Sequence, residues 1–394
     1  MKVRKSYLVL LIFTLYGVNH FVFERLLFFN EVLSLIGFYY FIKFSIRPNK
    51  KLYWPQSRIY RTVVALIILL SIYALGSLFV KTNWYYYFRN SSIIYSIFTF
   101  FIGFHLYHRQ YAFFKRIKKW LYLYAFGSFA IGSTMLIDRN AFGVWFALMQ
   151  RNLGVFSLLL LILLFSVYTL AFSSLTVVMI LFIVLFFALV KSYRLFKTSM
   201  YLALGGLAFL FLITANDLEL YKLGSHSLFG NILLVYKQHS FYNLDHNSSW
   251  RLLFWYRLLI ENFPENLIGI GIGTPLLPYR NNMISTELGH PDEYIAHVIG
   301  AHNTFITLFS RFGLGFLILI GIIYRSVFRE FYHHKSYYLK HKNDISLFLA
   351  FFTVTTVGIF NLLLETPTLA SVYWVFLGFV GAGIHNRKAK QNEV

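Results

Sequence analysis

Long apolar runs separated by short polar stretches dominate the chain. Most approach the roughly 17–25 residues that a helix needs to cross a bilayer. With 58% hydrophobic residues and a mean hydropathy of +0.61, the pattern predicts an all-α, polytopic integral membrane protein. The eleven runs lie near residues 6–23, 26–46, 62–80, 93–107, 120–137, 153–170, 175–190, 199–215, 303–323, 345–364 and 368–384.

Basic residues collect between these runs, which changes the meaning of the formal charge of +21 over 394 residues. Six patches contain most of the Lys and Arg residues, and the positive-inside rule predicts that all six patches and both termini are cytoplasmic. Because the charge marks one side of a membrane and forms no continuous surface, nucleic-acid binding is not expected. The patches lie near residues 2–5, 47–61, 109–119, 191–197, 325–342 and 387–390.

Residues 216–300 differ from the rest of the chain, since they form the one long stretch without a spanning run. Eight acidic and five basic residues give this stretch a net charge of −3. We therefore expect three parts: N-terminal transmembrane helices over 1–215, a large periplasmic or extracellular loop with short helices over 216–300, and C-terminal transmembrane helices with a cytoplasmic tail over 301–394.

The number of crossings stays open at ten or twelve. Two cytoplasmic termini require an even number, whereas the hydropathy gives eleven runs. The conflict lies within residues 138–190, where one run is either bent or re-entrant, or where a further crossing is hidden.

The external loop contains a predicted helix that begins after Ser248 and ends before Pro264. Its apolar residues recur at helical spacing. Arg257 can pair with Glu261 one turn further on, which is an ordinary surface contact. Arg251 has no such acidic neighbour, so it is a candidate for binding an anion such as a lipid pyrophosphate, whose oxygens match the guanidinium fork.

Two further signals follow the predicted helix. Gly269-Ile270-Gly271-Ile272-Gly273 lacks the spacing of a nucleotide-binding motif, so it is either a turn or a backbone that approaches a phosphate or sugar closely. His302 stands where the loop meets the next apolar run, and it is either an interfacial residue or a general base. The histidines nearby lack metal-ligand spacing, and the chain has no cysteine, so no metal site and no disulfide are expected.

Arg311 lies nine residues after His302, or about 13 Å deeper along a helix, and is expected to be buried in the membrane. Intramembrane arginines are usually functional or paired, and Glu31 is one candidate partner. Arg139, in Asp138-Arg139-Asn140, is a candidate on an earlier external loop.

Taken together, these residues resemble the O-antigen ligase and O-antigen polymerase family of bacterial inner-membrane proteins. The resemblance rests on Arg251 at the start of a loop helix, the glycine stretch at 269–273, and His302-Asn303 opening a helix that carries Gly313-Leu314-Gly315. It covers about 216–323, and more loosely Asp138-Arg139. The arginine that many members carry in a turn after the mid-chain helices has no counterpart here, where Phe172-Ser173-Ser174 stands.

The resemblance implies a metal-independent membrane glycosyltransferase of the GT-C type that needs no cofactor. Its donor would be an undecaprenyl-pyrophosphate-linked glycan, and its acceptor a second glycan or lipid A–core. His302 matches the family histidine and Arg251 the family loop arginine, which implies catalytic roles for both. The secondary candidates, for contact with pyrophosphate or sugar, are Arg139, Arg257, Arg280, Asn303 and Arg311.

Two alternatives remain open from the sequence. A flippase for lipid-linked oligosaccharides would also be polytopic, although such transporters often contain internal repeats, which are not evident here. Ligase and polymerase share the quoted motifs, so the sequence does not separate them.

Overall fold

The computed structural model describes residues 5–18, 29–45, 57–80, 83–109, 112–113, 194, 198, 201–202, 205, 255, 258–259, 263–276, 301–358 and 362–392. Helices make up most of these residues, and no β-strand occurs among them. The predicted helical class is therefore confirmed for this part of the chain. The runs at 120–137, 153–170, 175–190 and 199–215 lie almost wholly outside the described residues, so the number of crossings stays a prediction.

Three described helices are long and apolar enough to cross a membrane. They are α4 (Arg58–Ser77), α15 (Thr304–His333) and the part of α18 (Pro367–Asn392) from Leu369 to Lys388. All three coincide with predicted runs. The other described helices that coincide with predicted runs are α1 (Lys5–Val18), α3 (Phe29–Ser45) and α17 (Lys342–Gly358).

Two helices differ in length from the runs that predicted them. Helix α5 (Trp84–Tyr95) begins nine residues before the run at 93–107, because the Asn83 side chain caps it and polar residues lower the hydropathy of its first turns. It leads through η1 (Ser96–Phe98) into a helical segment over 99–109. Helix α15 continues ten residues past 323, since Val327 and Phe331 extend its buried stripe.

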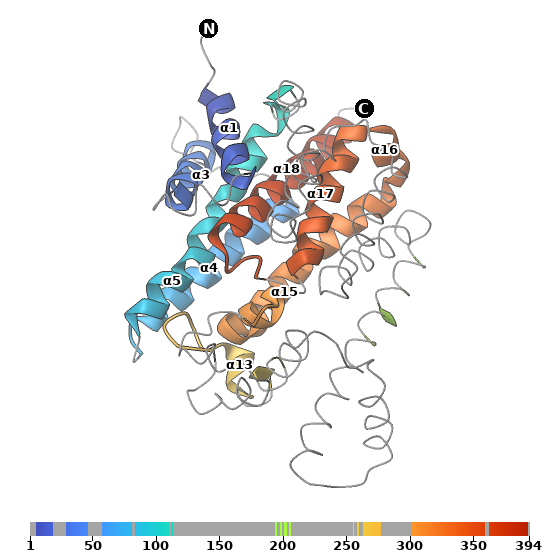
Figure 1. Ribbon diagram of the computed structural model, residues 1–394. Helices are drawn as coiled ribbons and strands as arrows, with labels where there is room; N and C mark the ends of the chain where they lie inside the picture. The colour runs from blue at the N-terminus through green and yellow to red at the C-terminus, as the bar shows by residue number, and fades with distance from the viewer. Residues whose placement is uncertain are drawn as a thin grey trace, which may run out of the picture.

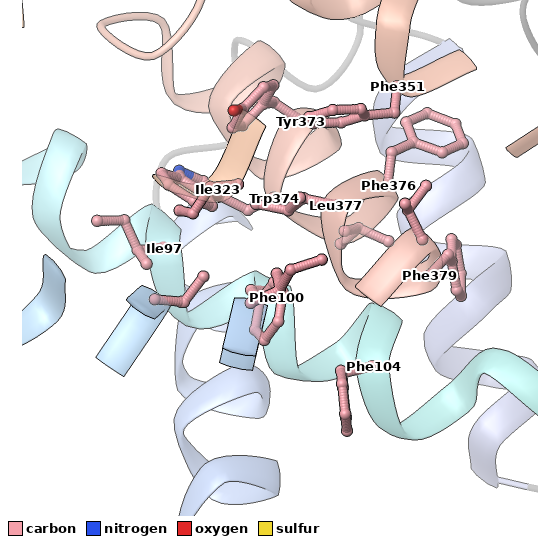
Figure 2. Packing of buried hydrophobic residues seen from close by; sticks show 14 of the residues in the cluster. Ile97, Phe100, Phe104, Ile323, Phe351, Tyr373, Trp374, Phe376, Leu377 and Phe379 are labelled. Carbon is pink, nitrogen blue, oxygen red and sulfur yellow. The ribbon is translucent and has the colours of Figure 1, made fainter. Parts of the chain in front are cut away.

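The core surrounds α18, whose side chains are buried on all sides over 370–382. Figure 2 shows Trp374 and Leu377 of α18 near Phe100 and Ile97 from the segment after α5. Tyr373 contacts Phe351 of α17 with 5.4 Å between ring centroids. A helix that is apolar on every face is expected at the centre of such a bundle.

The bundle has two chemically different ends. The basic end, defined by Lys5, Arg58, Arg109, Arg329 and Lys388, also holds the short helix α16 (Lys335–Lys340). Side-chain contacts join the helices at this end. For example, the Arg109 guanidinium donates to the Ser6 hydroxyl of α1. The loop end consists of residues 263–276, 301–303 and 362–366 and includes α13 (Glu265–Ile268). Figure 1 shows α1 and α16 toward one end of the bundle and α13 at the other.

The described basic residues of five of the predicted patches lie at the basic end, and the prediction that all six patches share one side of a membrane stays a prediction. Among the described residues, Arg89 of α5 and Arg311 of α15 are the arginines on the helix segments that contact the loop end. The assignment of the basic end to the cytoplasm stays a prediction.

Candidate functional site

The glycine stretch at 269–273 inserts into a break in α15. Gly313 has φ 67° and ψ −162° inside this helix, so the helical hydrogen-bond register is interrupted there. The carbonyl of Ser310 accepts instead from the Ile270 amide at 2.9 Å, and the carbonyl of Arg311 from the Gly271 amide at 2.9 Å. The loop thus replaces helical partners that the break removes.

Two glycines allow this close approach of backbones. A Cβ atom at Gly313 would lie against the carbonyl oxygens of Leu267 and Ile268, far inside van der Waals contact. A Cβ atom at Gly269, where φ is 105°, would meet the carbonyl of Arg311. Both positions also have a positive φ, which other residues rarely adopt. Glycine at 269 and 313 is therefore explained by this backbone conformation and by the close approach of the loop to α15.

Helices α4 and α5 hold the other side of the loop. The Ser77 hydroxyl accepts from the Ile272 amide at 3.2 Å, and the Asn90 side chain donates to the Ile272 carbonyl at 2.9 Å. The Asn83 amide donates to the Gly273 carbonyl at 2.9 Å. Because the amides of Ile270, Gly271 and Ile272 all donate within the chain, the interpretation that these amides cradle a phosphate does not hold.

Arg311 is fully buried, as predicted, and its described hydrogen bonds go to this loop. Its Nη1 donates to the carbonyl oxygens of Gly271 and Thr274, each at 3.2 Å. Glu365 is the acidic residue whose charge acts on Arg311. The candidate partner Glu31 instead accepts from the Tyr95 hydroxyl. These contacts give Arg311 a role in holding the loop, and its contact with pyrophosphate stays a prediction.

His302 lies immediately before the cap of α15 and has an unusual backbone conformation. Its φ is 50°, in the left-handed region where residues other than glycine are uncommon and which often marks functional sites. The Asn303 side chain accepts from the amides of Phe305 and Ile306, each at 3.0 Å. His302 is half-buried. Asn303 therefore fixes the helix start beside the histidine, and its predicted contact with substrate is untested.

Trp255, in the predicted loop helix, contacts the backbone beside His302. It is buried, and its indole Nε1 donates to the carbonyl of Ala301, the residue directly before His302. The Ala301 amide in turn donates to the Thr307 hydroxyl at 2.9 Å. Trp255, Leu258 and Leu259 are helical, in agreement with the predicted loop helix. The middle of the predicted loop helix is therefore joined to the backbone directly before His302.

Glu365 is a half-buried acidic residue of the loop end, with a buried carboxylate oxygen, that the sequence did not identify as part of the site. The Thr304 hydroxyl donates to its Oε2 at 2.5 Å, while its Oε1 is buried without a hydrogen-bond partner in the described part of the chain. Burial raises the pKa of Glu365, and the Thr304 and Thr307 hydroxyls and the Arg311 charge act in the opposite direction. The sequence signal that could have identified it is a carboxylate at the end of an apolar run.

The remaining predicted residues Arg139, Arg251, Arg257 and Arg280 lie outside the described residues. Within the described ranges no three His, Asp or Glu side chains gather closely enough to hold a metal ion, and metal independence stays a prediction. The chain matches no protein-family model and no curated protein.

Proposed function

We propose that the chain is a membrane glycosyltransferase that moves or joins oligosaccharide units from an undecaprenyl-pyrophosphate carrier. It would act as an O-antigen or capsule polymerase, or as an O-antigen ligase onto lipid A–core. The observation that supports the proposal is that Trp255 of the predicted loop helix, the glycine stretch and His302 lie close together at the loop end. The Trp255 indole donates to the Ala301 carbonyl, directly before His302. The glycine stretch donates to the carbonyls of Ser310 and Arg311 in α15.

The proposed reaction is a single displacement at the anomeric carbon of the donor sugar. The acceptor hydroxyl forms a new bond to that carbon, the bond from carbon to pyrophosphate oxygen breaks, and undecaprenyl pyrophosphate leaves with the electron pair. His302 accepts the hydroxyl proton as general base, which typically contributes about 10²–10⁴-fold in rate. Inversion at the anomeric carbon is expected.

Arg251 is proposed to stabilise the negative charge that grows on the pyrophosphate. The sequence predicts that it stands one helical turn before Trp255, whose indole bonds beside His302. Arg139, Arg257, Arg280, Asn303 and Arg311 are proposed as secondary contacts to pyrophosphate or sugar. Arg251→Lys should lose activity if bidentate contact with phosphate oxygens is needed, and near-full activity would argue for a simple charge.

The test uses purified full-length protein in liposomes with lipid-linked glycan extracted from a strain in which this gene is deleted. Release of polyprenyl pyrophosphate, measured over time, supports an enzyme. A transporter would move the lipid-linked glycan between leaflets without releasing the carrier, and that result would overturn the proposal.

Ligase and polymerase are separated by glycan analysis of the same deletion strain. Loss of a polymerase leaves single repeat units attached to the acceptor. Loss of a ligase leaves long chains on the carrier lipid.

A further inference from the structure

A cluster of charged side chains from three spanning helices lies at the basic end. Its centre is Glu330 of α15, which accepts from Arg387 of α18 through Oε1 and lies 3.4 Å from the Lys388 Nζ through Oε2. The guanidinium groups of Arg387, Arg329 and Arg58 all act on the Lys388 ammonium as like charges. These five residues are called the Glu330 cluster.

The Glu330 cluster carries excess positive charge. It contains four cations and one carboxylate. His334 lies 4.0 Å from Glu330, and burial and the neighbouring His333 and Lys388 lower the pKa of His334, which disfavours a further positive charge there. Like charges held together repel one another, and an anion bound among them would relieve this repulsion.

The cluster lies at the ends of candidate membrane-spanning segments, where lipid headgroups are expected. Arg58 is the first residue of one spanning segment, and Lys388 is the last residue of another. Glu330 and Arg387 form a buried base, each with a side chain 6% exposed, whereas the Lys388 side chain is 60% exposed. Arg58 and Arg329 are exposed as well. The exposed cations thus surround a fixed, buried ion pair at the membrane boundary.

We propose that the Glu330 cluster binds the phosphate of an anionic phospholipid headgroup. Guanidinium forks match phosphate oxygens, and basic pockets between transmembrane helices suit anionic headgroups. The positive-inside rule, which orients a protein in the membrane, requires only an excess of basic residues near the cytoplasmic ends of the spanning helices. It does not require that Arg58 of α4 and Arg329 of α15 lie close enough to act on Lys388 of α18, which itself contacts a buried carboxylate. This gathering of cations from three helices is what indicates a binding site.

The experiment titrates dioctanoyl phosphatidylglycerol into the full-length protein in detergent and follows the thermal unfolding midpoint, with dioctanoyl phosphatidylcholine as the zwitterionic comparison. Phosphatidylglycerol should raise the midpoint and phosphatidylcholine should not. Each removed cation should weaken the apparent affinity about fivefold. Arg58→Gln with Lys388→Gln should therefore weaken it about 25-fold.

Two controls separate a site from a general charge effect. Arg89→Gln removes an exposed arginine at the loop end, and Lys5→Gln removes an exposed lysine at the basic end outside the cluster. Both variants should bind phosphatidylglycerol like the wild type. Glu330→Gln should bind it more tightly while lowering the midpoint without lipid, whereas a purely structural cluster would show the lower midpoint alone.

Three outcomes would overturn the proposal. Equal effects of the two lipids would exclude recognition of the anionic headgroup. Equal loss in the double variant and in Lys5→Gln would exclude a localised site. An identical response to inorganic phosphate alone would show that the cluster recognises free phosphate and not the lipid.

Discussion

The two ends of the bundle are held together by different physical means. At the basic end, Glu330 joins α15 to α18 through ionic contacts with Arg387 and Lys388. At the loop end, backbone amides of the glycine stretch donate to carbonyls exposed by the break at Gly313. Even the buried charge of Arg311 is bonded there to carbonyl oxygens.

The difference matters because the two kinds of contact tolerate different changes. Ionic contacts depend on charge and allow side chains to vary in length, whereas backbone contacts depend on the absence of side chains at Gly269 and Gly313. A site that must position the proposed base His302 precisely is better supported by rigid backbone contacts. The comparison therefore favours the loop end as the place of chemistry and the basic end as the place of attachment to lipid.

The largest expected effect on stability is at the basic end. Glu330→Ala leaves Arg387 buried without the carboxylate it donates to, and removing one partner of a buried pair costs about 3–5 kcal/mol. The free energy of unfolding in mixed micelles should fall by that amount. Lys388→Gln is the control, since its side chain is 60% exposed and should cost under about 1 kcal/mol. Equal losses in both variants would contradict a buried pair.

Gly313→Ala should have the next largest effect. The added Cβ would meet the carbonyls of Leu267 and Ile268, and the left-handed conformation and overpacking together cost about 2–5 kcal/mol. Gly321→Ala on the same helix is the matched control, because nothing lies within 4 Å of its Cβ position. Unfolding in mixed micelles measures both. A Gly313→Ala protein as stable as Gly321→Ala would refute the inserted loop.

Ser77→Ala should have a smaller effect. It removes the hydroxyl that accepts from the buried Ile272 amide, and an unsatisfied buried donor costs about 1–3 kcal/mol. The control is Ser326→Ala, whose hydroxyl bonds to the Ile322 carbonyl within its own helix. Hydrogen exchange at the Ile272 amide gives a direct measurement. Unchanged protection there in Ser77→Ala would argue against this contact.

The sequence predicted the helices and the burial of Arg311, because hydropathy and depth along a helix are local properties. It did not predict where the Arg311 hydrogen bonds go, since carbonyl acceptors leave no charge pattern, and the acidic partner suggested by composition was Glu31. The hydrogen bond from the Ile270 amide to the Ser310 carbonyl was not predictable from the sequence either. It joins backbones forty residues apart, and an apolar run conceals the break at Gly313.

The position of Glu365 was missed for a similar reason. Its neighbour Thr304 is 61 residues away in the chain, and neither residue belongs to a motif. His302 was selected as a candidate because a polar residue at the edge of an apolar run is visible in the local sequence. Its left-handed conformation was not predictable from its residue type.

The most direct test of the central claim compares the same substitution at the two ends of the molecule. The rate of polyprenyl pyrophosphate release is measured for His302→Ala and for His341→Ala, whose residue is exposed at the basic end and stacks on Tyr337. The amounts of inserted protein are matched. His302→Ala should reduce the rate by about 10²–10⁴-fold, and His341→Ala should leave it near the wild-type value. Wild-type release from His302→Ala, or equal losses in both variants, would contradict a catalytic site at the loop end.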